Sequence, residues 1–481
     1  MLVAFFIAPI LVATLGVAAY GAWQLIVKWS AYLAYFDGRS HENLKWEIAR
    51  SGDKTDQYRR RVLGSSIIIW LSYLPLMLLG SIALVYYVST IDTNQEVESV
   101  TLLLVAILMA INSVLLGLQR FPEGLLNGSN IGYKSTFFRL VLLILSGVFS
   151  YLAILQGFGL IGLAVVQLST TVLLFLAYFV LVIRNLNWLG FRKPENLFLK
   201  QMYRNSFWFF LWSIVNFALL QLEVLMLGIF STVENVGKFA ITYFAIQLVT
   251  ALIATVIAAV LPGVGALIGK GKNSLVRKIR IESALYCWWL GLSLSVVIIV
   301  VNQSFVSVWV GADVFAGQLE SFLIAILAFQ LVILKNDSLL INLALEQREK
   351  VKVTLYGIAL VCFMSAFLIP LYGIVGACIS GIAGRVILLF LYPRIINSFL
   401  GSSRENIYGG RIILTSVLLF ISSYFIAGFI EISSWIGLIF VSGIGFIIAL
   451  IVSYLLGFSK DHRFLLKERM ASVSSAFGIV T

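Results

Sequence analysis

Hydrophobic runs bounded by charged or turn residues recur along the whole chain. Crossing the hydrocarbon layer takes about 20 residues of helix, and only helices and closed barrels satisfy the backbone in lipid. The short alternating segments of a barrel are missing. The pattern therefore predicts an all-α membrane protein of about fourteen transmembrane helices. The runs span residues 1–13, 18–37, 62–88, 100–119, 136–155, 159–183, 205–229, 236–268, 283–309, 318–334, 353–370, 373–392, 411–430 and 434–458.

Composition agrees with the pattern of runs. Of 481 residues, 60% are hydrophobic and only 12% are charged, whereas a soluble domain carries roughly a quarter charged residues. The net charge of +12 would suggest nucleic acid in a soluble protein. Basic loops that orient a membrane protein explain it better, so we expect no nucleic-acid partner.

The basic residues alternate between loops. Seven Lys and Arg lie between Arg39 and Arg61, and all but Lys28, Lys238 and Arg385 of the 34 in the chain fall in every second loop or the C-terminal tail. The opposite loops are short and acidic or uncharged. By the positive-inside rule both termini are cytoplasmic, which predicts a multi-pass protein of the bacterial inner membrane.

Candidate chemistry is scarce. No paired carboxylates, nucleophile elbow or metal-ligand spacing appears, and none of the short periplasmic loops could house a catalytic domain. The three cysteines lie in apolar runs, which disfavours a disulfide framework. His41 and His462 lie in charged loops, which disfavours a histidine metal site or a buried histidine proton relay. We therefore expect no enzyme activity, no cofactor and no metal.

Short signatures recur at an offset of 214 to 216 residues, which indicates an internal repeat. They are Phe158–Gly162 with Tyr372–Gly376, Leu125–Asn127 with Leu340–Asn342, and Tyr20–Trp23 with Val236–Phe239. Six helices per repeat give two lobes in the same orientation.

The repeat divides the chain into three parts. We expect an N-terminal lobe at 1–200, a C-terminal lobe at 201–400, and helices 13 and 14 with the cytoplasmic tail at 401–481. The offset also places the expected start of the first helix before Met1, so either Met1 is a late start or the first helix is short.

Lys28, Arg385 and Lys238 are the candidates for substrate binding, because a charge within an apolar run is costly unless it faces protein or water. Lys28 and Arg385 both lie about 15 Å into their helices at 1.5 Å per residue. Neither has a charged counterpart one repeat away. Two readings stay open: a buried anchor between helices, or a cationic lining for an anionic substrate.

Glu223 and Asn216 are the candidates for ion coupling, since they lie two turns apart on one face of the seventh helix. A local pair of Glu223 with Lys238 is the alternative. Asp37, at the end of the second helix beside Gly38, is explained by a helix-terminal turn.

Several short motifs resemble those of Wzx-type O-antigen flippases. They are the turn and helix start Leu15–Trp23, the seventh-helix pattern Glu223–Gly228 followed by Val236–Phe239, the aromatic-Gly openings Phe158–Gly162 and Tyr372–Gly376, and Leu261-Pro262 before a basic loop. That family usually has Asp where this chain has Glu223. The resemblance covers the whole chain, but its motifs are shared across a larger superfamily.

The resemblance implies a fold like that of multidrug and toxic-compound extrusion (MATE) transporters, with two six-helix lobes around a cavity open to one side at a time. It implies a lipid-linked oligosaccharide as substrate, H⁺ or Na⁺ as coupling ion, and the polysaccharide polymerase machinery as a partner. The alternatives are a MATE-like drug or cation antiporter and a lipid II-type flippase. A membrane glycosyl polymerase or ligase would need a large periplasmic loop, which this chain lacks.

The loop charges predict a topology that reporter fusions can test. Fusions should report periplasm after Glu96, Glu234 and Asp313, and cytoplasm after Arg60, Lys193 and Lys278. The reason is that cytoplasmic loops retain Lys and Arg. An inverted signal at any one site would contradict the fourteen-helix count.

Overall fold

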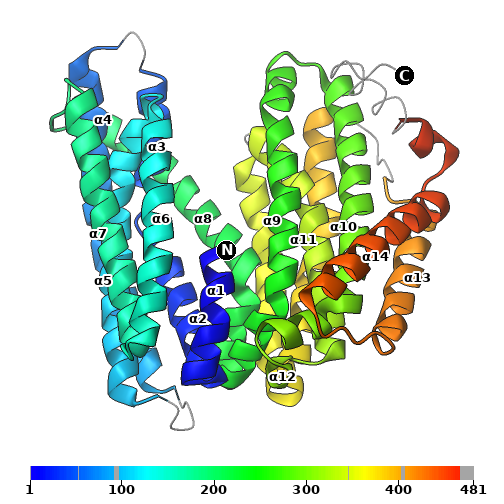
Figure 1. Ribbon diagram of the computed structural model, residues 1–481. Coiled ribbons are helices and arrows are strands. Elements are labelled where there is room, and N and C mark those ends of the chain that lie inside the picture. Colours follow the sequence, from blue (N-terminus) through cyan, green and yellow to red (C-terminus); the bar gives the residue numbers. More distant parts are fainter. Residues whose placement is uncertain (1, 52–53, 92–96, 345, 402–406, 466–481) are drawn as a thin grey trace. The chain divides into compact units, whose positions relative to one another are not determined.

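A computed structural model describes residues 2–51, 54–91, 97–344, 346–401 and 407–465, and these residues are almost entirely helical (Figure 1). The prediction of an all-α fold is confirmed. The elements are α1 Leu2–Leu15, α2 Val17–Leu33, α3 Ser40–Ala49, α4 Asp56–Ser89, α5 Ser99–Gly128, α6 Gly132–Leu155, α7 Gly159–Asn185, α8 Asn196–Phe230, α9 Val233–Gly269, α10 Asn273–Trp309, the 3₁₀ turn η1 Ala312–Val314, α11 Gln318–Leu343, α12 Gln347–Leu400, α13 Gly410–Ala427 and α14 Trp435–Gly457. The Glu96 fusion point and the tail from residue 466 lie outside the described residues.

The long element α12 consists of two helices that fold back on each other. Gly373 between them has φ 54° and ψ −125°, a conformation that side-chain-bearing residues rarely adopt. The two halves approach closely, since a Cβ on Gly357 would lie 3.0 Å from the Gly384 carbonyl oxygen. The two runs expected at 353–370 and 373–392 are therefore the two arms of one hairpin.

The fourteen expected membrane segments are all represented by helices. Ten helices of the described chain are long and apolar enough to cross a membrane. α12 supplies two of the segments, and α1, α2 and α9 supply the remainder, while α3 is a short helix in the first basic loop.

Large apolar side chains cover the outside of these helices. Ile144 on α6, Phe425 on α13 and Ile439 on α14 are 65%, 66% and 73% exposed. Continuous apolar surface on this scale is unfavourable in water but is what hydrocarbon requires. The chain is a multi-pass membrane protein.

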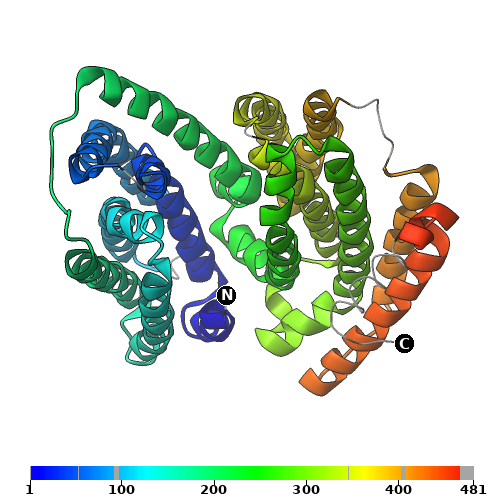
Figure 2. The same ribbon diagram turned by 90° about the horizontal axis from the view of Figure 1, so that it is seen from above.

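The chain divides into two compact units, unit 1 at Met1–Gly237 and unit 2 at Lys238–Thr481. In unit 1, α5 packs against α4 and α7, and α6 packs against α7. In unit 2, α11 packs against α10 and α12, while α13 and α14 lie against α10 (Figures 1 and 2). The pairs α5–α7 and α11–α12 occupy the same places in the two repeats.

Helix α8 packs along unit 1 from its first third to its end (Figure 2). The side-chain amide of Asn43 on α3 donates to the Met202 carbonyl oxygen over 3.1 Å. Further along, the Phe217 ring stacks on Tyr32 of α2 with centroids 5.3 Å apart. The helix that opens the second repeat is thus held against the first-unit helices α2, α3 and α4.

Gly21 on α2 and Gly237 on α9 hold the starts of these two helices in backbone contact. A Cβ on Gly21 would lie 1.8 Å from the Val233 carbonyl oxygen, and one on Gly237 would lie 2.5 Å from the Val17 carbonyl oxygen. Gly21 and Gly237 occupy equivalent positions in the sequence repeat, so the two equivalent glycines lie next to each other.

Replacing Gly21 by Val should strongly reduce the amount of folded protein. The added side chain would meet backbone atoms that cannot move aside, and overpacking alone costs about 1–3 kcal/mol. The measurement is the level and melting temperature of the purified protein in detergent. Gly443→Val on α14 is the matched control, because a Cβ on Gly443 meets nothing within 4 Å. Equal losses in both variants would contradict the backbone-contact explanation.

Candidate functional site

Lys28 lies in the middle of α2, half-buried within unit 1. Its ammonium group makes no hydrogen bond or ion pair with any residue that the structure describes. An ammonium has three donors and no acceptor, and at bilayer depth it is costly without an acceptor. Among the described residues, Lys28 is therefore a half-buried lysine whose side chain has no acceptor.

Glu223 lies on α8 at the same level as Lys28. The Tyr32–Phe217 ring contact lies on one side of this level. On the other side, a Cβ on Gly228 would lie 2.4 Å from the Leu25 side chain. The order of these two contacts along the helices shows that α2 and α8 run antiparallel. Lys28 and Glu223 both lie between the two contacts. Glu223 is 6% exposed and engaged in an interaction of its own.

The other candidates are distributed over both units. Asn216 is half-buried on α8, next to Phe217 and two turns before Glu223. Lys238 is the first residue of unit 2 and lies half-buried near the start of α9. The structure thus brings Lys28, Glu223 and Asn216 onto the α2–α8 pair, whereas Lys238 and Arg385 belong to unit 2.

Arg385 is 3% exposed and links the second arm of α12 to α11. Its Nη1 donates to the Leu327 carbonyl oxygen over 3.2 Å. One turn away, Gln330 donates to the Ile382 carbonyl oxygen over 3.4 Å. In this structure Arg385 connects α12 to α11 by a hydrogen bond. Its assignment to substrate binding stays a prediction.

A buried charge cluster at the end of α2 is absent from the sequence-based interpretation. Its members are Asp37, Arg39, His41 and Arg120, called the Asp37 cluster below. Asp37 is 0% exposed, and its carboxylate accepts from Arg120 Nη1 over 3.0 Å and from the Arg39 backbone N–H over 2.9 Å. His41 Nδ1 lies 3.2 Å from the same carboxylate. His41 is 7% exposed, so this loop histidine is buried.

The protonation states of the Asp37 cluster follow from burial and charge. Burial alone would raise the pKa of Asp37, but His41, Arg120 and Arg39 hold it well below its usual range. Burial lowers the pKa of His41 by more than the neighbouring Asp37 raises it. Asp37 is therefore ionised and His41 neutral near pH 7.

Two cations from the predicted basic loops of unit 2 are also buried. Arg280 on α10 is 2% exposed and donates to Asp337 over 3.1 and 3.0 Å and to Asn397 over 3.1 Å. Lys350 on α12 is 0% exposed and donates to the Ser338 carbonyl oxygen over 2.7 Å. Both have acceptors inside the unit, which explains how they are tolerated away from water.

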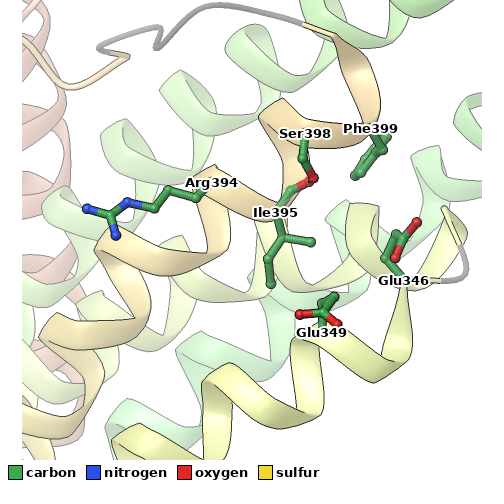
Figure 3. Close-up of a pocket in the computed structure, with 6 residues that line it drawn as sticks. All are labelled: Glu346, Glu349, Arg394, Ile395, Ser398 and Phe399. Carbon is green, nitrogen blue, oxygen red and sulfur yellow. The ribbon is translucent and has the colours of Figure 1, made fainter.

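A cavity of about 330 Å³ in unit 2 lies where the two ends of α12 meet (Figure 3). Figure 3 shows the Arg394 guanidinium pointing away from the carboxylates of Glu346 and Glu349. Glu349 pairs with Lys352 over 2.7 Å. None of the predicted site residues lines this cavity. Among the described residues no cluster of three or more His, Cys, Asp or Glu could hold a metal ion.

The fold is that of transporters of the MOP superfamily. The lipid II flippase MurJ in its inward closed conformation matches with a TM-score of 0.69 and 13% identity, over 94% of this chain and 96% of that one. An inward-facing multidrug resistance MATE family transporter matches with a TM-score of 0.60 and 15% identity, over 84% and 96%. A MOP superfamily transporter from Pyrococcus furiosus matches at 0.56 and 16%, over 83% and 92%.

No protein-family model matches the sequence, and no curated protein sequence matches it either. The structural likeness, at these low identities, establishes the fold alone. The Wzx-type assignment therefore rests on the sequence motifs.

The Asp37 cluster predicts how stability depends on pH. Folding lowers the pKa of His41 below its ordinary value of about 6.5, so the unfolded chain binds the proton more tightly. Stability is therefore full above about pH 6.5 and is lost as the pH falls below it. The melting temperature in detergent should fall between pH 7 and pH 5, and less so in His41→Gln. Identical pH profiles for the two proteins would contradict this role of His41.

Proposed function

We propose that the protein is a flippase that moves an undecaprenyl-pyrophosphate-linked oligosaccharide from the cytoplasmic to the periplasmic leaflet by alternating access. The substrate would be an O-antigen or similar repeat unit, which assigns the protein to lipopolysaccharide or polysaccharide biosynthesis. The location would be the bacterial inner membrane, with both termini cytoplasmic. The observation that carries the proposal is the ammonium of Lys28, half-buried at bilayer depth with no partner among the described residues.

The chemistry of the substrate fits a membrane-embedded cation. A pyrophosphate is a dense anion that must leave water to cross the bilayer, and charge-assisted hydrogen bonds from Lys or Arg are the strongest compensation available. Its prenyl tail can stay in lipid meanwhile. The likeness in fold to the lipid II flippase MurJ supports the same class of substrate.

The remaining candidates receive supporting roles in the proposal. Arg385 and Lys238 supply further positive charge to the substrate as the protein changes conformation, Arg385 by leaving the Leu327 carbonyl oxygen. Glu223 and Asn216 take the coupling ion, H⁺ or Na⁺. Glu223 suits this role because it is buried at the level of Lys28, so its charge state would influence how strongly Lys28 attracts an anion.

A MATE-like antiporter for organic cations is the second candidate, because the buried carboxylate of Glu223 could bind a cation directly. The two functions make opposite demands on Lys28. A cationic substrate is repelled by Lys28 and should be transported better when its charge is removed. An anionic substrate requires that charge.

Substitutions at these residues test the proposal by complementation of a flippase-null strain, scored as surface polysaccharide per amount of membrane-inserted protein. Lys28→Gln should reduce flipping by about tenfold or more, since one charge-assisted hydrogen bond is worth about 1.5–3 kcal/mol. Lys28→Arg should retain much of it. Lys200→Gln, at an exposed position near the start of α8, is the control and should be neutral.

Further variants test the supporting roles. Arg385→Ala should abolish flipping and Arg385→Lys restore it partly, because only a guanidinium offers a bidentate fork. Glu223→Gln should change the dependence on the ion gradient. Full complementation by Lys28→Gln at normal protein level would contradict the proposal. A gain of drug resistance in Lys28→Gln would favour the antiporter.

A further inference from the structure

The stripe of α2 that carries Lys28 continues toward the cytoplasmic end of unit 1. Tyr32 follows four residues later on the same helical face, and Tyr35 lies two residues past the end of α2 at Leu33. Beyond α2 the chain turns, and the Arg39 guanidinium comes to lie 5.1 Å from the centre of the Tyr35 ring. Side chains able to contact an anion or a sugar therefore run from the basic end of unit 1 to Lys28.

A second guanidinium reaches the same ring from α5. Arg120 lies 5.3 Å from the centre of Tyr35, so two positive charges share one aromatic side chain. Asp37 fixes this arrangement, because it accepts from Arg120 Nη1 and from the backbone N–H of Arg39. Arg39 itself is held in the left-handed region, with φ 50° and ψ 28°.

Most donors of the two guanidiniums are unused. A guanidinium has five N–H donors. Among the described residues, Arg120 donates only through Nη1, to Asp37 and the Ala34 carbonyl oxygen. Arg39 donates through Nη2 to Glu42, and its Nε is buried without a partner.

The charges of this group also call for an anion. Asp37 is saturated by its contacts with Arg120, Arg39 and His41. Burial, and after it the positive charge of Arg120, lowers the pKa of Arg39. A guanidinium does not give up its proton near neutral pH. Asp37 pairs with Arg120, and Glu42 pairs with both Arg39 and Lys45, so three cations here share two carboxylates.

We propose that Arg39 and Arg120, stacked on Tyr35, form a binding site for a phosphate or pyrophosphate group at the cytoplasmic end of unit 1. Asp37 is the positioning residue of this site. The proposal rests on the proposed function in one respect: it makes this group the loading site from which a lipid-linked pyrophosphate passes along Tyr32 to Lys28. Lys28 lies five residues before the end of α2 at Leu33, and Arg39 lies six residues beyond that end.

Binding of two probes to the purified full-length protein in lipid nanodiscs tests the site. The probes are inorganic pyrophosphate and farnesyl pyrophosphate, measured by isothermal titration calorimetry in nanodiscs of phosphatidylcholine. The main variant is Arg39→Gln, because the Arg39 side chain has only Glu42 as a hydrogen-bonding partner among the described residues and its loss should leave the fold intact. Arg139→Gln is the matched control, since Arg139 is an exposed arginine of the same unit.

Arg39→Gln should weaken binding of farnesyl pyrophosphate at least tenfold with an unchanged melting temperature, Arg39→Lys should weaken it less, and Arg139→Gln should leave it unchanged. Unchanged binding in Arg39→Gln would overturn the site, as would an equal loss in Arg139→Gln or no binding of either probe to the unmodified protein. Binding of inorganic pyrophosphate alone would overturn the loading role. Loss of farnesyl pyrophosphate binding in nanodiscs that contain phosphatidylglycerol would also overturn the loading role, because the site would then bind anionic lipid in general.

The outcome is separable from that of the proposed function. If Arg39→Gln binds farnesyl pyrophosphate normally while Lys28→Gln fails to complement, the loading site is wrong and the flippase stands. If Arg39→Gln loses binding while Lys28→Gln complements fully, the phosphate site stands and the flippase proposal falls.

Discussion

The cost of leaving a charge or a backbone polar group without a partner in hydrocarbon governs this structure. It makes every spanning segment helical and places almost all lysines and arginines in alternate loops. It also explains the buried cations of unit 2, since Arg280, Lys350 and Arg385 each have acceptors within the unit. Lys28 departs from this rule, and for that reason it carries the functional argument.

Hydropathy predicts the membrane helices closely because each span must be apolar along its whole length. The expected break between 370 and 373 coincides with the non-helical Gly373. Hydropathy does not predict helix α3, because this helix is short and polar overall. Its burial depends on α5, which is distant in the sequence. Gly124 and Gly128 of α5 leave room for the α3 backbone, with a Cβ on Gly128 only 2.7 Å from the Lys45 carbonyl oxygen.

The candidate site was predictable only in part, for a related reason. A charge inside an apolar run identifies Lys28 and Arg385 equally well. Only the packing distinguishes them. α11 brings the Leu327 carbonyl oxygen to Arg385, whereas no acceptor from the described part of the chain reaches Lys28. Local sequence explains Asp37 by a helix-terminal turn alone, because its partner Arg120 lies 83 residues away in the chain.

The glycine contact between α2 and α9 has a consequence for which sequences this fold can accept. Gly21 and Gly237 each lie against the backbone of the other's helix. A larger residue at one position cannot be offset by a smaller one at the other, because glycine is already the smallest residue. The spacing of the two helix starts therefore constrains two positions that lie 216 residues apart in the chain.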